Sequence, residues 1–320
     1  MSAAPAADSA RVQGAYASLR AAMARTIVGQ DEVMRLVFTT LLCSGHSLLE
    51  GVPGVGKTLI VRTLARLLDV GFGRIQFTPD LMPSDILGTP ILDPREGRPH
   101  FRPGPLFTDV LLADEINRAS AKTQAALLEA MQERSATVDG TSHALGPFFT
   151  VFATQNPVEH EGTYPLPEAE LDRFLFKIVV SYPAEADEVA LLALHHVHGA
   201  GDGAVAPLLQ RGDLTACREA AGAVIVRDEI VRYAAALVRA TRANVNFSLG
   251  ASPRAGVMLL RAAKANACIE GRDYAIPEDV QEMWLPTLRH RVQLHPAAEV
   301  EGLVVDQALE AALAGVTVPR

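Results

Sequence analysis

A glycine-rich segment early in the chain has the residue types and spacing of a phosphate-binding loop. Residues 51–58 read GVPGVGKT, which matches GxxxxGK(S/T) at every fixed position. Glycine lets successive backbone N–H groups face an anion, and the N-terminus of the following helix adds more donors. Lys57 would contact the β- and γ-phosphates of a nucleotide, and Thr58 would offer a hydroxyl to Mg²⁺. The expected nucleotide contacts here are Gly51, Pro53, Gly54, Val55, Gly56, Lys57, Thr58 and Leu59.

Two carboxylates follow a short apolar run and could complete such a site. Val110–Ala113 predicts a buried strand, and Asp114 and Glu115 come directly after it. The carboxyl ends of parallel strands face the crevice in which ligands bind. Asp114 therefore suits coordination of Mg²⁺, and Glu115 suits polarising a water for attack on the γ-phosphate. Alone, the pair could equally be a solvated strand end, but the glycine loop favours the functional interpretation.

An amide side chain follows another apolar run. Phe148–Ala153 predicts a strand, and Asn156 comes shortly after it. An amide can hold an attacking water without being ionised, so Asn156 is a candidate sensor of the γ-phosphate. The dipeptide Asn156-Pro157 is just as typical of a plain turn. Spacing alone leaves both interpretations open.

The elements that must position these residues alternate between strands and helices. Short apolar runs predict strands at 46–50, 75–77, 110–113, 148–153 and 174–180, with helices at 58–68 and 121–133. This alternation indicates a mainly parallel sheet covered on both faces. A helix at 9–24 precedes it, and Met1–Asp8 is expected to lack regular structure. Beyond Pro183 the pattern is helical only, at 184–198, 215–221, 228–239, 253–270 and 277–285.

Composition limits the classes of function. Of 320 residues, 49% are hydrophobic but only 5% aromatic, which predicts an aliphatic core. The net charge of −8 disfavours a protein that depends on attraction to a nucleic-acid backbone. Three separated cysteines without CxxC spacing indicate neither a disulfide framework nor a zinc site, and favour the cytoplasm. We expect no membrane span, because no apolar run reaches about 18 residues.

Long stretches of the chain closely resemble the MoxR family of AAA+ ATPases. Residues 104–174 carry most of the likeness, with GPLFTDVLLADEINRA, KTQAALLEAMQE and FATQNPVEHEGTYPLPEAELDRF. Upstream, IVGQDEVM, GVPGVGKT and RIQFTPDLMPSDILG are similar, and downstream so are LGASPRA and GRDYAIPEDV. The resemblance covers about residues 27–295. It implies an α/β fold: a P-loop AAA+ αβα sandwich with a five-stranded parallel sheet, followed by a smaller all-α lid domain.

The resemblance also implies domain bounds and roles for single residues. The bounds are an N-terminal tail and helix over 1–26, the nucleotide-binding domain over 27–183 with an inserted hairpin within about 85–105, and the lid over 184–320. Asn156 becomes the first sensor, Arg173 an arginine finger that reaches the neighbouring subunit, and Arg254 the second sensor, contacting the γ-phosphate of its own subunit. Val28 and Gln30 lie where the family binds the adenine side. Without the resemblance, Arg173 would be read as a partner of nearby carboxylates and Arg254 as a first-turn helix residue.

The function implied by the resemblance is Mg²⁺-dependent hydrolysis of ATP to ADP and phosphate in a homo-oligomeric ring, usually a hexamer. The ring would remodel a client or co-chaperone protein, activate it, or load a cofactor or metal into it, and the partner could bear a von Willebrand factor A domain. One alternative is a DNA-acting motor, because related helicases share the sandwich, lid and hairpin, although the acidic charge disfavours nucleic acid. Another is a nucleotide-gated scaffold with negligible turnover, against which the Asp114–Glu115 pair argues.

Overall fold

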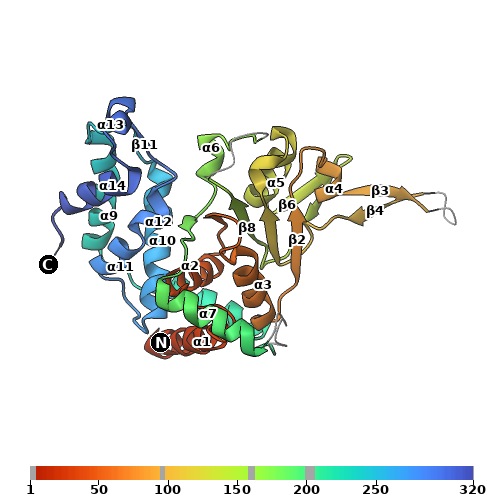
Figure 1. The fold of residues 1–320 in the computed structure, drawn as a ribbon, viewed down its shortest axis with the longest axis horizontal. Helices are drawn as coiled ribbons and strands as arrows, with labels where there is room; N and C mark the ends of the chain where they lie inside the picture. Colours follow the sequence, from red (N-terminus) through yellow and green to blue (C-terminus); the bar gives the residue numbers. More distant parts are fainter. Residues whose placement is uncertain (1–4, 94–97, 158–162, 199–205, 320) are drawn as a thin grey trace.

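A five-stranded parallel sheet forms the centre of the computed structural model, which describes residues 5–93, 98–157, 163–198 and 206–319 (Figure 1). The strand order is β2–β5–β8–β1–β9, and every neighbouring pair is parallel. The strands are β1 (Ser47–Glu50), β2 (Phe72–Gln76), β5 (Val110–Asp114), β8 (Thr150–Gln155) and β9 (Phe176–Val179). All five predicted strands are confirmed, with their ends shifted by up to three residues.

Helices cover both faces of this sheet, because successive strand residues point to opposite sides. Leu112 joins the core beneath α1 (Pro5–Met23), α2 (Asp31–Leu42) and α3 (Lys57–Leu67). Its neighbour Leu111 joins a second core beneath α4 (Pro83–Leu87) and α5 (Ala121–Glu133). The predicted αβα sandwich is therefore confirmed.

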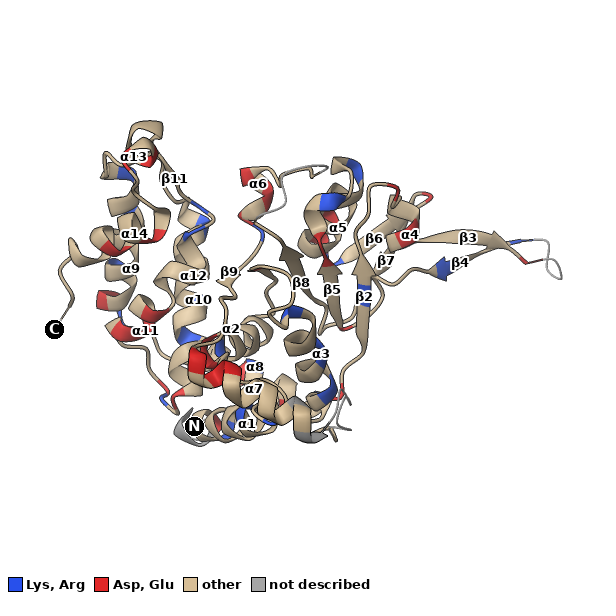
Figure 2. Ribbon diagram, in the orientation of Figure 1, with Lys and Arg blue, Asp and Glu red and all other residues tan. Residues whose placement is uncertain are grey.

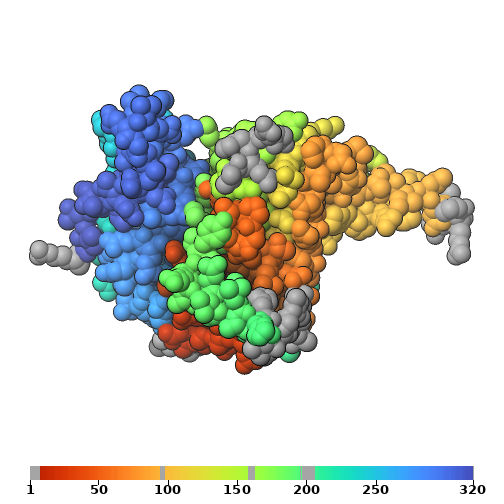
Figure 3. Space-filling model, viewed as in Figure 1, coloured from red at the N-terminus to blue at the C-terminus, as the bar shows by residue number. Residues whose placement is uncertain are grey.

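Two β-hairpins extend the sandwich. The expected inserted hairpin is formed by β3 (Gly88–Leu92) and β4 (Pro99–Pro103) and projects far from the body (Figures 1 and 3). A second hairpin, β6 (Ser135–Val138) with β7 (Thr141–Ala144), was not predicted. Its turn is Asp139-Gly140, with φ of 48° and 76°. Asp-Gly is a strong hairpin signal in a sequence, so the second hairpin could have been found.

The C-terminal part is helical, as expected, apart from one pair of very short strands. The short strands β10 (Phe247–Leu249) and β11 (Gln293–Leu294) pair in an antiparallel manner within it. These strands are only two or three residues long, and their register shifts between Phe247 and Leu249. They are therefore too short and irregular to give a strand pattern in the sequence. The helices are α7 (Glu185–His198), α8 (Arg211–Ala223), α9 (Asp228–Ala243), α10 (Pro253–Ile269), α11 (Pro277–Glu282), α12 (Trp284–Leu288), α13 (Pro296–Val300) and α14 (Val305–Ala314).

The N-terminal helix belongs to the core. Val12, Leu19 and Met23 on one face of α1 are almost fully buried, as their helical spacing predicted. They pack in the cluster that also contains residues of α8 and α10. Of the segment expected to be irregular, Met1–Ala4 lies outside the described residues, and the helix already begins at Pro5. The helix α1 therefore joins the sandwich to the C-terminal helices.

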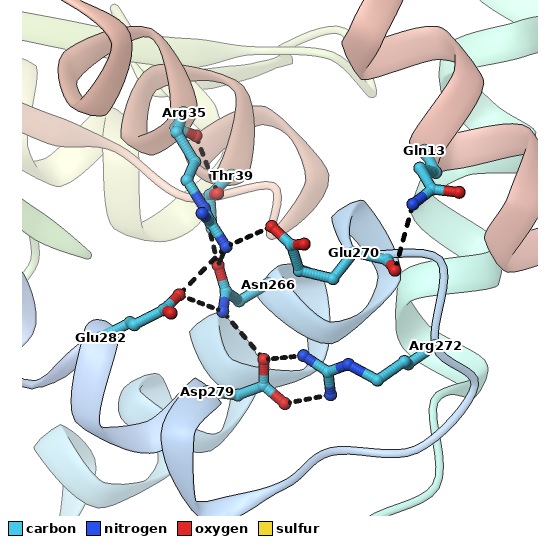
Figure 4. A network of polar contacts seen from close by, with 8 residues as sticks. All are labelled: Gln13, Arg35, Thr39, Asn266, Glu270, Arg272, Asp279 and Glu282. Atoms are coloured by element: carbon cyan, nitrogen blue, oxygen red, sulfur yellow. Dashed lines mark hydrogen bonds and ion pairs between the residues drawn. The ribbon is translucent and has the colours of Figure 1, made fainter.

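A polar network fixes the sandwich against the C-terminal helices (Figure 4). Arg35 on α2 donates to the Asn266 side-chain oxygen on α10, with N···O distances of 2.5 and 2.9 Å. The Asn266 amide donates to Asp279 Oδ1 at 2.8 Å. Asp279 in turn accepts two hydrogen bonds from Arg272, at 2.6 and 2.7 Å. Bidentate pairs of this kind hold a defined geometry, so α2, α10 and α11 form one rigid junction.

Charges of both signs are interspersed over the sandwich and the C-terminal helices (Figure 2). Acidic residues gather in the first turn of α7, at Glu185, Asp187 and Glu188. Among the described residues, no helix is both long and apolar enough to cross a membrane.

A buried histidine links three parts of the sandwich. His46 lies just before β1, where its Nδ1 accepts from the Val151 N–H at 2.9 Å and its Nε2 contacts the Met131 carbonyl at 3.2 Å. The ring is therefore neutral with its proton on Nε2. Burial, with a smaller contribution from the charge of Arg134, lowers the pKa of His46 to about 3.

We predict that this histidine makes stability depend on pH. The unfolded chain takes up a proton on His46 below about pH 6.5 and the folded chain does not, so the free energy of unfolding falls as pH falls from 6.5 towards 5. In His46→Gln this slope should be shallower by up to about 1.4 kcal/mol per pH unit. Urea denaturation at several pH values measures it, with the exposed His196→Gln as control. An unchanged slope in His46→Gln would contradict the prediction.

Candidate functional site

The glycine loop lies between β1 and α3, at the carboxyl end of the sheet. Gly54 and Gly56 have φ of 87° and 86°, a left-handed conformation that disfavours other residues. A Cβ atom at either position would meet no other atom within 4 Å, so open space lies beside the backbone. Gly51 is required for a different reason, because a Cβ atom there would clash with the Val180 carbonyl oxygen. The first glycine thus permits close packing, and the later two shape the loop.

The start of α3 offers a site for an anion. Its N-cap is Gly56, which has no side chain to cap the first-turn N–H groups. These groups and the helix dipole favour a negative charge at this end. The Lys57 ammonium donates to the carbonyls of Gly51 and, at 3.0 Å, of Val52. It is therefore positioned over the loop that a phosphate would enter.

One threonine on a neighbouring strand organises the two carboxylates. Thr154 on β8 donates its hydroxyl to Asp114 Oδ1 at 2.5 Å and accepts the Glu115 N–H at 2.9 Å. The other Asp114 oxygen accepts from Arg74 at 2.7 and 3.1 Å. Glu115 has φ of 56°, which is unusual for a side chain with a Cβ atom. Strain of this kind persists where the surroundings hold it, and it is common at functional sites.

The Glu115 carboxylate is held from two sides. Gln76 at the end of β2 donates to its Oε2 at 2.8 Å, and Arg118 pairs with the same oxygen at 3.3 Å. Gln76, Asp114 and Thr154 lie at or near the carboxyl ends of adjacent strands. The topology therefore brings the acidic pair and its partners to one edge of the sheet.

The glycine loop, Asp114, Glu115 and Thr154 line one cleft of about 500 Å³. Asn156, which is buried just after β8, also lines it. Most of the residues predicted for the site are thus brought together. The lining residues are Thr26, Pro53, Gly54, Val55, Gly56, Lys57, Thr58, Leu59, Arg62, Asp114, Glu115, Thr154, Gln155 and Asn156.

Several predicted residues are not among those that line the cleft. Gly51 packs behind the loop, as described above. Val28 is partly exposed, and the buried Gln30 donates to the Ser181 carbonyl at 3.1 Å. Thr26 lines the cleft from the same segment.

Arg173 and Arg254 lie together in a second pocket, of about 150 Å³. Its lining includes Cys43–His46, which precede β1, whereas the glycine loop follows β1. Arg173 likewise precedes β9. The second pocket is therefore at the opposite edge of the sheet from the cleft. This position of Arg254 does not match the expected contact with the phosphates of its own chain. A sequence motif does not show where the C-terminal helices lie relative to the sheet.

Sequence reasoning missed the residues that hold the acidic pair. Arg74 and Gln76 alternate along β2, and Thr154 is two residues before Asn156. In the structure Gln76 pairs with Asp114, and Ala153 pairs with Ala113, a register that the sequence does not show. The polar residues at the end of each strand were the available signal.

Comparison with known families assigns both parts of the chain. Residues 46–176 match the ATPase family associated with various cellular activities (AAA), and residues 239–312 match the AAA lid domain. The first match contains the glycine loop, the acidic pair and Arg173. The second contains Arg254.

Individual proteins are similar over nearly the whole chain. Chaperone MoxR1 of Mycobacterium tuberculosis is 44% identical, over 92% of this chain and 80% of its own length. Protein MoxR of Paracoccus denitrificans is 33% identical, over 95% and 96%. A crystal structure of a candidate ATPase from Cytophaga hutchinsonii superposes with a TM-score of 0.90 at 38% identity, over 98% and 97% of the two chains.

We predict that Thr154 stabilises the acidic pair. In Thr154→Val the Glu115 N–H and one Asp114 oxygen lose their partner, which should lower the free energy of unfolding by about 1–3 kcal/mol. Thermal and urea unfolding measure the change. Thr154→Ser keeps the hydroxyl and should lose less. Equal stability of Thr154→Val and the wild type would contradict this role.

Proposed function

Because the chain belongs to the MoxR family of AAA+ ATPases, we propose that it hydrolyses ATP to ADP and phosphate in a homo-oligomeric ring of six subunits. The ring would use this cycle to remodel or activate a partner protein, or to load a cofactor or metal into it. The observation that carries the proposal is the cleft at the carboxyl edge of the sheet. There the glycine loop, the acidic pair and Asn156 surround one space large enough for a nucleotide.

The donor set fits Mg²⁺. The Thr58 hydroxyl and the Asp114 carboxylate line the same cleft, and Mg²⁺ prefers oxygen ligands of this kind. When bound, the ion would neutralise charge on the phosphates. Thr58 and Asp114 would hold it, with Asp114 kept in place by Thr154 and Arg74.

The other residues of the cleft would bind and orient the reacting groups. The amides at the start of α3 and the Lys57 ammonium would hold the β- and γ-phosphates. Glu115, fixed by Gln76 and Arg118, would orient a water and polarise it for attack. Asn156 would donate to that water or to the γ-phosphate. Val28, Gln30 and Gly51 would support the adenine side and the loop from behind.

Arg173 and Arg254 would act on the ATP of a neighbouring subunit. Both lie at the edge of the sheet opposite to their own cleft, so a second copy is needed to bring them to a nucleotide. A guanidinium supplied in this way stabilises the charge of the transition state. Hydrolysis would then depend on assembly.

The proposed partner of the ring is a protein. The chaperone name of MoxR1 supports a protein client, and a partner with a von Willebrand factor A domain is our candidate. The projecting β3–β4 hairpin offers a surface for it (Figure 3). Cys43, Cys217 and Cys268 are free and buried, which suits the reducing cytoplasm in which we place this activity.

We predict that two single variants abolish turnover for different reasons. Glu115→Gln should bind ATP and assemble, but its ATPase rate should fall at least 100-fold because the water is no longer polarised. Arg173→Ala should lose about 10³-fold or more because the neighbouring phosphates lose their cation. Rates are measured by phosphate release at matched oligomeric state, which size-exclusion chromatography with light scattering establishes.

Glu185→Gln on the exposed surface of α7 is the control and should keep the wild-type rate. Unchanged turnover in both Glu115→Gln and Arg173→Ala would overturn the assigned mechanism. A wild type that binds ATP but releases no phosphate would instead favour the nucleotide-gated scaffold.

A further inference from the structure

Four arginines surround the pocket at the amino edge of the sheet. Arg134 follows α5, Arg173 precedes β9, and Arg254 and Arg261 lie seven residues apart on α10. Within the described ranges, no carboxylate lines this pocket and none of the four arginines forms an ion pair. The chain thus brings four like charges together from three segments without neutralising them.

Two of these arginines have no role in the function proposed so far. Arg134 donates to the Ser44 carbonyl at 2.6 Å, and Arg261 donates to the Cys43 carbonyl. Each guanidinium has five N–H donors, and among the described residues these contacts occupy one group in each. Both side chains are thereby held at the pocket wall with donors to spare.

The arrangement is electrostatically unfavourable without an anion. Burial lowers the pKa of Arg134, and the nearby charge of Arg261 lowers it further. An anion between the guanidinium groups would reverse this repulsion and accept their remaining hydrogen bonds. The pocket volume of about 150 Å³ is well below the ~300 Å³ at which nucleoside-sized ligand sites begin, so it suits a small oxyanion.

We propose that this pocket is an oxyanion site for a phosphate group, in which Arg134 and Arg261 form an inner pair behind Arg173 and Arg254. This assignment rests on the proposed function: in the assembled ring, the phosphate is the terminal one of the ATP bound by the neighbouring subunit. Free inorganic phosphate has the same chemistry and is the other source that the experiment distinguishes. Arg134 and Arg261 are thus further phosphate contacts in a site built for a second copy of the chain.

A purely structural role offers a competing explanation, and the chain contains its own control for it. Cys43 is the C-cap of α2, so Arg134 and Arg261 could serve only to satisfy carbonyls at that helix end. Arg218 has this structural role near the same helix end, because it donates to the Leu41 and Pro147 carbonyls at 2.7 and 2.8 Å. It is not among the residues that line the pocket.

The first arm of the experiment measures phosphate binding directly. Inorganic phosphate is titrated against the full chain carrying Lys57→Ala, which weakens the glycine loop, and the thermal midpoint is followed. We expect phosphate to raise the midpoint, and Arg134→Gln with Arg261→Gln to abolish that rise. Arg218→Gln should lower the midpoint without phosphate but keep the rise. Retention of the rise in the double variant, or its equal loss in Arg218→Gln, would overturn the site.

The second arm measures ATPase rate at matched oligomeric state in the otherwise wild-type chain. Arg134→Gln and Arg261→Gln should each lower the rate at least tenfold, while Arg218→Gln stays within about twofold. Loss of phosphate binding with unchanged turnover would support the site but assign it to free phosphate. A wild type without turnover that still binds phosphate would overturn the proposed function and leave the site standing. If the glutamine variants do not fold, Arg134→Lys and Arg261→Lys keep the charge and should weaken phosphate binding partially.

Discussion

A buried guanidinium joins the nucleotide-site half of the chain to the C-terminal helices. Arg291, whose side chain is 1% exposed, pairs with Asp172 at 2.7 Å and donates to the carbonyls of Phe174 and, at 3.1 Å, Leu175. Burial lowers its pKa to about 10, so it stays charged at neutral pH. Removing one partner of such a pair leaves a buried charge uncompensated, which costs about 3–5 kcal/mol. Arg291 also contacts the sulfur of Met258 on α10, and Asp172 precedes Arg173, so this contact also fixes where Arg173 lies relative to α10.

Many residues of the cleft were predictable because they lie within short motifs whose spacing can be read from the sequence. A glycine loop between a strand and a helix can be recognised from its spacing, and Asp114 follows a strand whose apolar residues are unmistakable. The αβα sandwich follows from the same alternation of strands and helices. What a sequence does not show is which strand lies beside which. Thr154 became important only when β8 was placed next to β5.

The second pocket was beyond sequence reasoning for a different reason. Its residues come from segments more than two hundred positions apart, between Cys43 and Arg261, and only packing brings them together. The motif around Arg254 indicated what the side chain could bind but not whose phosphate it would meet. That depends on how α10 sits against the sandwich, which the Arg35–Asn266 contact and the buried Arg291 help to fix.

The two pockets give each subunit a polarity, because one lies at the carboxyl ends of the parallel strands and the other at their amino ends. On the proposed assembly every complete site belongs to an interface and none to a subunit. A closed ring has as many interfaces as subunits, but an open arc has one fewer. In an open arc, the subunit at one end therefore has a glycine loop that no neighbouring arginine reaches. The subunit at the other end has an arginine pocket that faces no neighbouring nucleotide. Ring closure would add a whole active site at the moment that the last gap is filled.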